Sequence, residues 1–292
     1  MKAIAGKPQT LFEFLSEQYP DSPRTRVKKL LGSGHVRVNS VFVTLNSYRL
    51  KPGDEVSVDM HAMSDKRRDF PFPVLFEDKD LIAVEKPAGI STSSIDGSAS
   101  VQEILTGFIR DRTRGKQSAV VVHRLDKEVS GVLLFAKSQR ISDIIRDGWK
   151  ETKKKYYALV ESPPKTKSGT INSWLKEDSR QKVSSVGERE NGKFAVTNYN
   201  VVKQVGNYTL LDVNTETGRK NQIRVHLSEM GCPIVGDRRY GASDEFIRRI
   251  RLHAYSLAFI HPITGEKIIL ESPMPGGFLT IKQQDEKYKK VF

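Results

Sequence analysis

The chain has 292 residues, of which 37% are hydrophobic, and these values predict a folded globular protein with one large core and a small module. A formal net charge of +13 at pH 7 favours a polyanionic partner, because each Lys or Arg near a phosphate releases condensed counterions. The single cysteine excludes an internal disulfide framework and a cysteine-rich zinc site, and no apolar run approaches the ~20 residues that span a bilayer.

Residues 1–60 are predicted to form a small α+β module. Thr10 and Glu13 have the spacing of a capping box before an amphipathic helix, and Ser22-Pro23 predicts the start of a second helix. Short strands are expected at His35–Val38, Val41–Thr44 and Glu55–Val58. Basic residues gather on the second helix and the first strand, which predicts an RNA-binding face rather than a merely solvated one: Arg24, Arg26, Lys28, Lys29 and Arg37.

Residues 61–72 carry charges and prolines without periodicity and are predicted to be a linker, so that a second domain covers residues 73–292. This domain alternates apolar β-type runs with a few helical stretches. Strands are expected at Val74–Phe76, Leu81–Val84, Ala119–Val122, Val132–Ala136, Tyr156–Val160, Thr170–Leu175, Phe194–Val202, Tyr208–Val213, Ala254–Ile260 and Lys267–Glu271. Helices are expected at Val101–Arg110, Ile141–Trp149, Lys220–Met230 and Asp244–Ile250. Strands outnumber helices, so the predicted class is α+β with a largely antiparallel mixed sheet.

The stretch from Ala119 to Ala136 predicts a strand, a short polar loop and a second strand. The loop places the carboxylate of Asp126 beside the guanidinium of Arg124 and the ring of His123. Loops held by rigid strands often carry reactive side chains. Taken alone, however, an exposed salt bridge between Arg124 and Asp126 is the commoner arrangement.

Further short motifs follow in chain order, and each has an ordinary structural explanation by itself. Lys86-Pro87-Ala88-Gly89 has the chemistry of a turn, and Lys154–Val160 that of a strand with two tyrosines. In Thr217–Leu227, the residues Ile223, Leu227 and Met230 have helical spacing that would bury one face, with Arg224 next to it. His253 and His261 are expected to be hydrogen-bonded turn residues, and Cys232 a small core residue.

Together these segments, with His123-Arg124-Leu125-Asp126, resemble the motifs of the RluA-type pseudouridine synthase family. The stretch from Arg24 to Val58 resembles the S4 RNA-binding domain. The resemblance implies the pseudouridine synthase fold and an isomerase that acts on uridines in RNA. It also implies catalytic roles for Asp126, Tyr156 and Arg224. The residues implied in substrate binding are Lys86, His123, Arg124 and Arg219.

The reaction implied by this resemblance needs a carboxylate at the site. Pseudouridine formation breaks the N-glycosidic bond, turns the base and rejoins it through C5, and a carboxylate serves as nucleophile or stabilises positive charge on the sugar. Whether Asp126 attacks the base or the ribose stays open. Arg224 would keep Asp126 ionised, Tyr156 would stack on the uracil, and Arg124 would support a nucleotide extruded from its stack. The isomerisation requires no cofactor and no metal.

The sequence departs from the family pattern at two positions. Val129 stands where the family usually has Thr, and Asn221 replaces the usual His of the Gly-Arg-x-His-Gln motif. Asn both donates and accepts hydrogen bonds, so we expect altered surroundings of the site rather than an inactive enzyme.

Two other functions compete with this prediction. One is a non-catalytic RNA-binding or ribosome-assembly factor, and the other, ranked last, is a nuclease or phosphotransferase, which normally needs clustered carboxylates around a divalent cation. The expected RNA is 23S rRNA first and tRNA second. We further expect a cytoplasmic monomer without a membrane partner.

Overall fold

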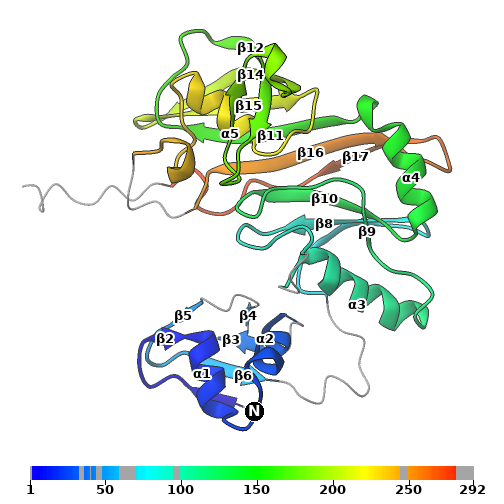
Figure 1. Cartoon of the computed structure of the whole chain (residues 1–292). Coiled ribbons are helices and arrows are strands. Elements are labelled where there is room, and N and C mark those ends of the chain that lie inside the picture. Colours follow the sequence, from blue (N-terminus) through cyan, green and yellow to red (C-terminus); the bar gives the residue numbers. More distant parts are fainter. Residues whose placement is uncertain are drawn as a thin grey trace, which may run out of the picture. The chain divides into compact units, whose positions relative to one another are not determined.

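The computed structural model describes residues 2–32, 36–39, 41–43, 48–58, 70–94, 99–243 and 249–280. The chain divides into two compact units, whose helices and strands are labelled in Figure 1. One comprises residues 1–128 and 133–147, and the other residues 129–132 and 148–292. The predicted linker at 61–72 lies mostly outside the described residues, and the predicted domain boundaries stay predictions.

The N-terminal part of the first unit is a small module of short strands and two helices. Its elements are β1 (Lys2–Ile4), β2 (Gln9–Thr10), α1 (Leu11–Gln18), α2 (Arg24–Gly32), β3 (Val36–Val38), β4 (Val41–Phe42), β5 (Arg49–Leu50) and β6 (Glu55–Val58). Strands β1, β6, β3 and β4 form one sheet in that order, and β2 pairs with β5. The predicted capping box of α1 is confirmed, since Glu13 N donates to Thr10 Oγ1 over 3.2 Å and Thr10 N donates to Glu13 Oε2 over 2.8 Å. The module closes its own apolar core, which includes Leu11, Leu15, Val27, Leu31, Val36 and Val56.

The rest of the first unit contains β7 (Val74–Glu77), β8 (Leu81–Lys86), α3 (Val101–Thr113), β9 (Val120–Val121), most of β10 (Ser130–Ala136) and α4 (Gln139–Asp147). Strand β9 pairs antiparallel with β10, with Val121 opposite Phe135. This is the predicted strand, loop and strand. Helix α4 is tied to β9 by the hydroxyl of Ser142, which donates to Val121 O over 3.2 Å.

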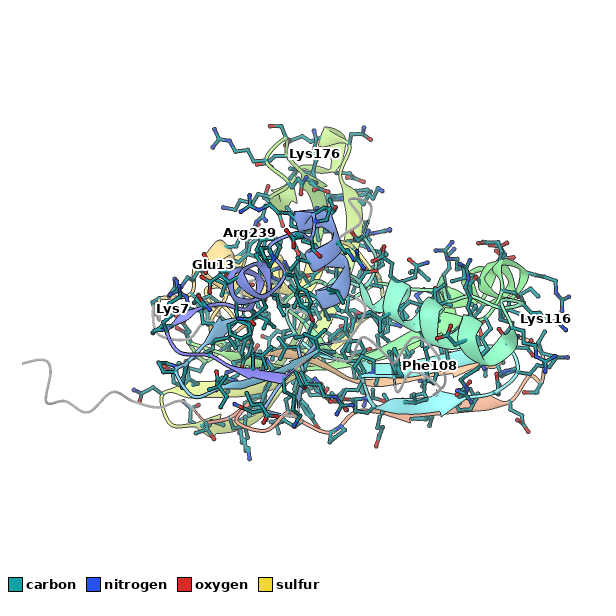
Figure 2. All side chains as sticks on the ribbon, turned by 90° about the horizontal axis from the view of Figure 1, so that it is seen from below. Lys7, Glu13, Phe108, Lys116, Lys176 and Arg239 are labelled. Atoms are coloured by element: carbon teal, nitrogen blue, oxygen red, sulfur yellow. The ribbon has the colours of Figure 1, made fainter. Side chains whose placement is uncertain are left out.

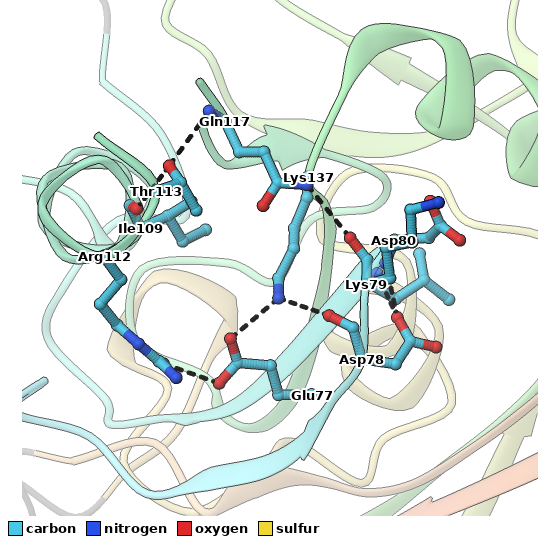
Figure 3. A network of polar contacts seen from close by, with 10 residues as sticks. Glu77, Asp78, Lys79, Asp80, Ile109, Arg112, Thr113, Gln117 and Lys137 are labelled. Carbon is cyan, nitrogen blue, oxygen red and sulfur yellow. Dashed lines mark hydrogen bonds and ion pairs between the residues drawn. The ribbon is translucent and has the colours of Figure 1, made fainter. Parts of the chain in front are cut away.

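A polar network joins three elements of this unit (Figure 3). Glu77, at the end of β7, accepts hydrogen bonds from Lys137 over 2.8 Å and from Arg112 of α3 over 2.9 Å. Burial raises the pKa of Glu77, but these two cations outweigh it and lower the pKa. Lys137 is only 7% exposed and follows β10 directly, so the network anchors the end of the strand that leaves the Asp126 loop.

The second unit is built on an antiparallel sheet. Its strands are β11 (Lys153–Val160), β12 (Ser168–Glu177), β13 (Val183–Val186), β14 (Lys193–Val205), β15 (Tyr208–Thr215), β16 (Leu252–Ile260) and β17 (Lys267–Glu271). They are ordered β13-β12-β14-β15-β11-β16, and β17 pairs with β16. Helix α5 (Gln222–Glu229) and short 3-10 turns at Trp149–Glu151, Glu188–Glu190 and Arg238–Tyr240 complete the unit. Ser130 and Gly131 of β10 add a parallel pairing with β16.

The α+β class and the largely antiparallel sheet are therefore confirmed. Strands β1, β2 and β5 of the N-terminal module were not predicted. Three details of the larger part of the chain also differ from the sequence predictions. Strand β13 was not predicted, His253 lies within β16 rather than in a turn, and α5 is buried from Gln222 through Leu227 rather than on one face. The predicted helix Asp244–Ile250 falls largely on residues outside the described part. No helix among the described residues is long and apolar enough to cross a membrane.

Candidate active site

The loop that carries Asp126 is held on both sides of the aspartate. Leu125 is buried, its N–H donates to Thr92 Oγ1 over 3.1 Å, and the Thr92 hydroxyl donates to Leu125 O over 2.9 Å. On the other side, Lys127 O accepts from Gly89 N over 2.8 Å. Asp126 itself is half-buried. The residues on either side of this carboxylate are thus fixed by backbone hydrogen bonds to one neighbouring segment.

Lys86 is the centre of that neighbouring segment. Its side chain is 0% exposed, and its ammonium donates to three carbonyl oxygens, those of Pro87 at 3.0 Å, Ile90 at 2.8 Å and Lys127 at 3.1 Å. Gly89 has φ of 94°, a conformation that favours glycine, and this turn brings its N–H to the same Lys127 oxygen. The Lys-Pro-x-Gly motif therefore braces the Asp126 loop, and a substrate-binding role for Lys86 stays a prediction.

His123 and Arg124 begin the loop. The Nε2 atom of His123 accepts a hydrogen bond from the backbone N–H of Leu134 in β10 over 3.0 Å, which links the start of the loop to the strand after it. Arg124 is exposed. An exposed guanidinium beside a half-buried carboxylate suits contact with a phosphate or an unstacked base.

Tyr156 lies in the second unit, on β11. It pairs with Val213 of β15 and Ala254 of β16, and the register with β16 shifts between Lys155 and Tyr156. Tyr156 is half-buried. Because side chains alternate along a strand, Tyr157 points to the opposite face.

Tyr157 has a different environment from Tyr156. It stacks on Tyr255 with ring centroids 4.0 Å apart, and the Tyr255 hydroxyl donates to Asp212 over 3.0 Å. Burial and this bond to Asp212 raise the pKa of Tyr255. Of the two tyrosines of the motif, Tyr157 is therefore packed in an aromatic stack, whereas Tyr156 lies on the other face of the strand.

Arg224 of α5 is buried in a bidentate ion pair with Asp237. Its Nε donates to Asp237 Oδ2 over 2.6 Å and its Nη2 to Asp237 Oδ1 over 2.8 Å. The two residues are 8% and 1% exposed. A bidentate pair of this kind fixes the plane of the guanidinium as well as its position. Asp237 was not predicted as a partner of Arg224, although a carboxylate in the apolar run Gly231–Asp237 requires a cation if it is buried.

Asn221 and Tyr240 complete the surroundings of Arg224. Asn221 Oδ1 accepts from Arg224 Nη1 and Asn221 Nδ2 donates to the Tyr240 hydroxyl, both over 3.0 Å. The Arg224 guanidinium carbon lies 4.9 Å from the centroid of the Tyr240 ring, a cation–π contact. Asn221 has φ of 54°, which asparagine tolerates better than most residues. Asn221, which replaces the usual His of the family, therefore fits this position because its amide accepts from Arg224 and donates to Tyr240.

Gln222 organises the turn before α5. Its Oε1 accepts from the Thr217 hydroxyl over 2.7 Å and from Arg219 N over 3.0 Å, and its Nε2 donates to Val196 O over 2.9 Å. The exposed Arg219 side chain donates to Phe194 O over 3.0 Å. These bonds tie the Thr-Gly-Arg segment to β14.

The predicted site residues therefore belong to both units. Lys86, His123, Arg124 and Asp126 lie in the first, whereas Tyr156, Arg219 and Arg224 lie in the second. An ion pair between Asp126 and Arg224 stays a prediction. Among the residues that the structure describes, no group of three or more His, Cys, Asp or Glu side chains is arranged to hold a metal ion.

The predicted RNA-binding residues of the N-terminal module are largely accessible. Arg24, Arg26 and Lys28 of α2 are exposed and Arg37 of β3 is half-buried, while the Lys29 side chain lies outside the described set. Basic side chains elsewhere also face solvent, as Lys116 and Lys176 do (Figure 2). The positive charge of the protein is thus available at its surface.

Comparison with known proteins finds the same two families that the sequence motifs resemble. The family model described as RNA pseudouridylate synthase matches residues 80–229, and the S4 domain model matches residues 9–56. An uncharacterised RNA pseudouridine synthase of Synechocystis is 33% identical over 92% of this chain and 86% of its own. A ribosomal large subunit pseudouridine synthase D of Pasteurella multocida is 29% identical over 94% of this chain and 90% of its own. The solved structure of human RNA pseudouridylate synthase domain containing 4 shares the fold, with a TM-score of 0.59 and 24% identity over 70% of this chain and 90% of that one.

Proposed function

Because this chain belongs to the RNA pseudouridylate synthase family and is an RNA pseudouridine synthase of the RluA type with an S4 domain, we propose that Asp126 is its catalytic carboxylate. The observation that carries this proposal is the bracing of the Asp126 loop by Thr92, Gly89 and the buried Lys86. A catalytic carboxylate must be held in one orientation while the reaction proceeds.

In the proposed reaction, the C1′–N1 bond of the target uridine breaks and a C1′–C5 bond forms. C5 then loses its proton and N1 takes up a proton, so the product is an isomer of the substrate. Asp126 attacks the base or the ribose, or stabilises the positive charge that develops on the sugar. Tyr156 stacks on the uracil and assists the proton transfer at C5. The target nucleotide is extruded from its stack before reaction, with Arg124 supporting the RNA that it leaves.

Arg224 has a positioning role in this proposal. A guanidinium has five N–H donors, so its bonds to Asp237 and Asn221 do not exclude a further carboxylate partner. With its plane fixed by Asp237, Arg224 would present charge to Asp126 and keep that carboxylate ionised.

The proposed substrate is 23S rRNA, recognised by the S4 domain as well as by the larger domain, with the enzyme acting as a monomer. Support comes from the curated relative that covers nearly the whole chain and is named a large-subunit enzyme. Mapping of carbodiimide-reactive uridines in total RNA, from cells with and without the gene, tests this target. Loss of a modification from tRNA instead would identify the second candidate substrate.

Asp126→Asn tests the catalytic assignment, with Glu128→Gln as the matched control from the same loop. We expect Asp126→Asn to abolish pseudouridine formation on 23S rRNA while RNA affinity and Tm stay near wild type. Glu128→Gln should retain activity. If Asp126→Asn kept activity within about tenfold of wild type, a change of only about 1.4 kcal/mol in the barrier, the assignment would be wrong.

A further inference from the structure

Two arginines of the second unit, Arg249 and Arg251, are half-buried without a carboxylate partner among the described residues. Arg249 Nη2 donates to the Ser130 hydroxyl over 3.2 Å, and Arg251 Nη2 donates to Thr280 O over a long 3.4 Å. The Nε of Arg251 is buried and has no hydrogen-bond partner in the part of the chain that the structure describes. The backbone of Arg251 is well anchored, since its N–H donates to Val235 O and its carbonyl accepts from Leu159 N.

Three other buried cations of the described residues are compensated by their partners. The Lys86 ammonium donates to three carbonyl oxygens. Arg224 is paired with Asp237, and Lys137 is paired with Glu77. Burial of a charge is costly unless an opposite charge or several hydrogen bonds compensate it. Arg249 and Arg251 each have one hydrogen bond and no acidic partner among the described residues, so their charge is poorly compensated there.

Arg249 and Arg251 are two residues apart in the chain, and neither has a carboxylate partner among the described residues. Burial lowers the pKa of both arginines, and the charge of Arg249 further lowers that of Arg251. Two cations held together without an acid form the kind of site that an anion with several oxygen atoms completes, because a guanidinium presents parallel N–H donors to phosphate.

The described groups that Arg249 contacts carry no negative charge. The Ser130 hydroxyl lies 3.0 Å from His253 Nδ1, and His253 Nε2 lies 3.3 Å from Ser272 O. Burial lowers the pKa of His253, which favours the neutral ring. Arg249 therefore donates into a neutral chain of hydrogen bonds, and its charge remains to be matched from outside.

The position of Ser130 connects this pair to the reaction. Ser130 follows Asp126 by four residues, and four residues of extended chain span at most about 14 Å. An anion held by Arg249 beside Ser130 is therefore within reach of a polynucleotide whose target base is at Asp126.

We infer that Arg249 and Arg251 form a binding site for a backbone phosphate of the substrate RNA next to the target uridine. This inference rests on the proposed function for the identity of the RNA. The site supplies affinity and register, whereas the chemistry belongs to Asp126. The substrate would then supply the negative charge that these two arginines lack among the described residues.

The test compares Arg249→Gln and Arg251→Gln with Arg112→Gln, an arginine that is ion-paired with Glu77. Binding of polyuridylate is measured at several salt concentrations, because it reports phosphate contacts without any chemical step. Loss of one phosphate contact should lower the slope of log K against log salt by about 0.7, while Arg112→Gln should leave the slope at the wild-type value.

Thermal unfolding supplies a second readout. In phosphate-free buffer of low salt, Arg251→Gln should unfold at or above the wild-type Tm, because the substitution removes repulsion. Inorganic phosphate should raise the Tm of the wild type more than that of either variant, because it binds the folded state. Failure of Arg251→Gln to fold would show that this guanidinium is structural and would overturn the inference.

Two further results would decide whether Arg249 and Arg251 bind an RNA phosphate. An unchanged salt slope in both variants overturns the inference, and phosphate protection with an unchanged slope means an adventitious ion only. Pseudouridine formation by the wild type is assayed separately with carbodiimide. A wild type that binds RNA through Arg249 but forms no pseudouridine refutes the proposed function and leaves the phosphate site standing.

Discussion

The environment of Arg224 shows how single residues are matched to one another in this protein. Asp237 takes two of its N–H groups, Asn221 accepts a third, and the Tyr240 ring covers the guanidinium. The Tyr240 hydroxyl in turn accepts from Asn221 and from Val183 N. Each polar group in this buried cluster has a partner of complementary chemistry. Removal of one member leaves another buried group unpaired, which lowers the stability of the fold.

Replacement of Asp237 by Asn should therefore be strongly destabilising. The substitution leaves the buried Arg224 charge without its anion, and loss of one partner of a buried pair typically costs about 3–5 kcal/mol. Urea unfolding measures the free energy change. The control is Glu177→Gln, which breaks the exposed pair with Lys220 and should cost no more than about 1 kcal/mol. Equal losses in the two variants would show that the Arg224–Asp237 pair contributes no more than a surface pair.

At the scale of elements, β10 connects the two units of the chain. Its residues are buried throughout, and Gly131 lies against the backbone of β16. A Cβ added at Gly131 would lie 2.1 Å from Ala254 O, and the glycine has φ of 125°. Strand β10 approaches β16 this closely only because Gly131 has no side chain.

Gly131→Ala should accordingly destabilise the protein by about 3 kcal/mol or more, through both the backbone clash and the strained φ. Gly206→Ala is the matched control, since Gly206 also has positive φ, at 58°, but has nothing within 4 Å of an added Cβ. The control should cost about 1–2 kcal/mol, the typical penalty of a left-handed residue. Differential scanning calorimetry of both variants measures the difference, and equal shifts in Tm would contradict the close packing of β10 on β16.

For the whole molecule, the separate core of residues 2–58 indicates a division of labour. The N-terminal module buries its own apolar residues and exposes Arg24, Arg26 and Lys28 on α2. The larger part of the chain contains every predicted catalytic residue. This arrangement favours an RNA anchor joined to a catalytic body.

Deletion of residues 1–60 should therefore weaken binding to 23S rRNA and flatten its salt dependence, since log K falls with log salt in proportion to the phosphates contacted. The truncated enzyme should still modify RNA at saturating concentration. A full-length variant with Arg24→Gln, Arg26→Gln and Lys28→Gln should reproduce the loss of salt slope. Full affinity in the truncated enzyme would exclude the anchor role, and loss of turnover at saturation would show that the two parts do not function separately.

The sequence by itself determined the features that depend on neighbouring residues. The Thr10–Glu13 capping box, the strand, loop and strand around Asp126, and most strands of the sheet were predicted because local hydrogen bonds and residue periodicity specify them. The family and the kind of enzyme were likewise predicted from ordered motifs.

Only the tertiary structure decided which distant groups meet. Arg224 pairs with Asp237 because the chain turns back after α5, and Lys86 reaches Lys127 across 41 positions of sequence. Periodicity predicted one buried face for α5, but β12, β13 and β14 and the Arg238–Tyr240 turn pack around it and bury both. Such contacts depend on how whole elements pack, and a local pattern of residues does not specify that packing.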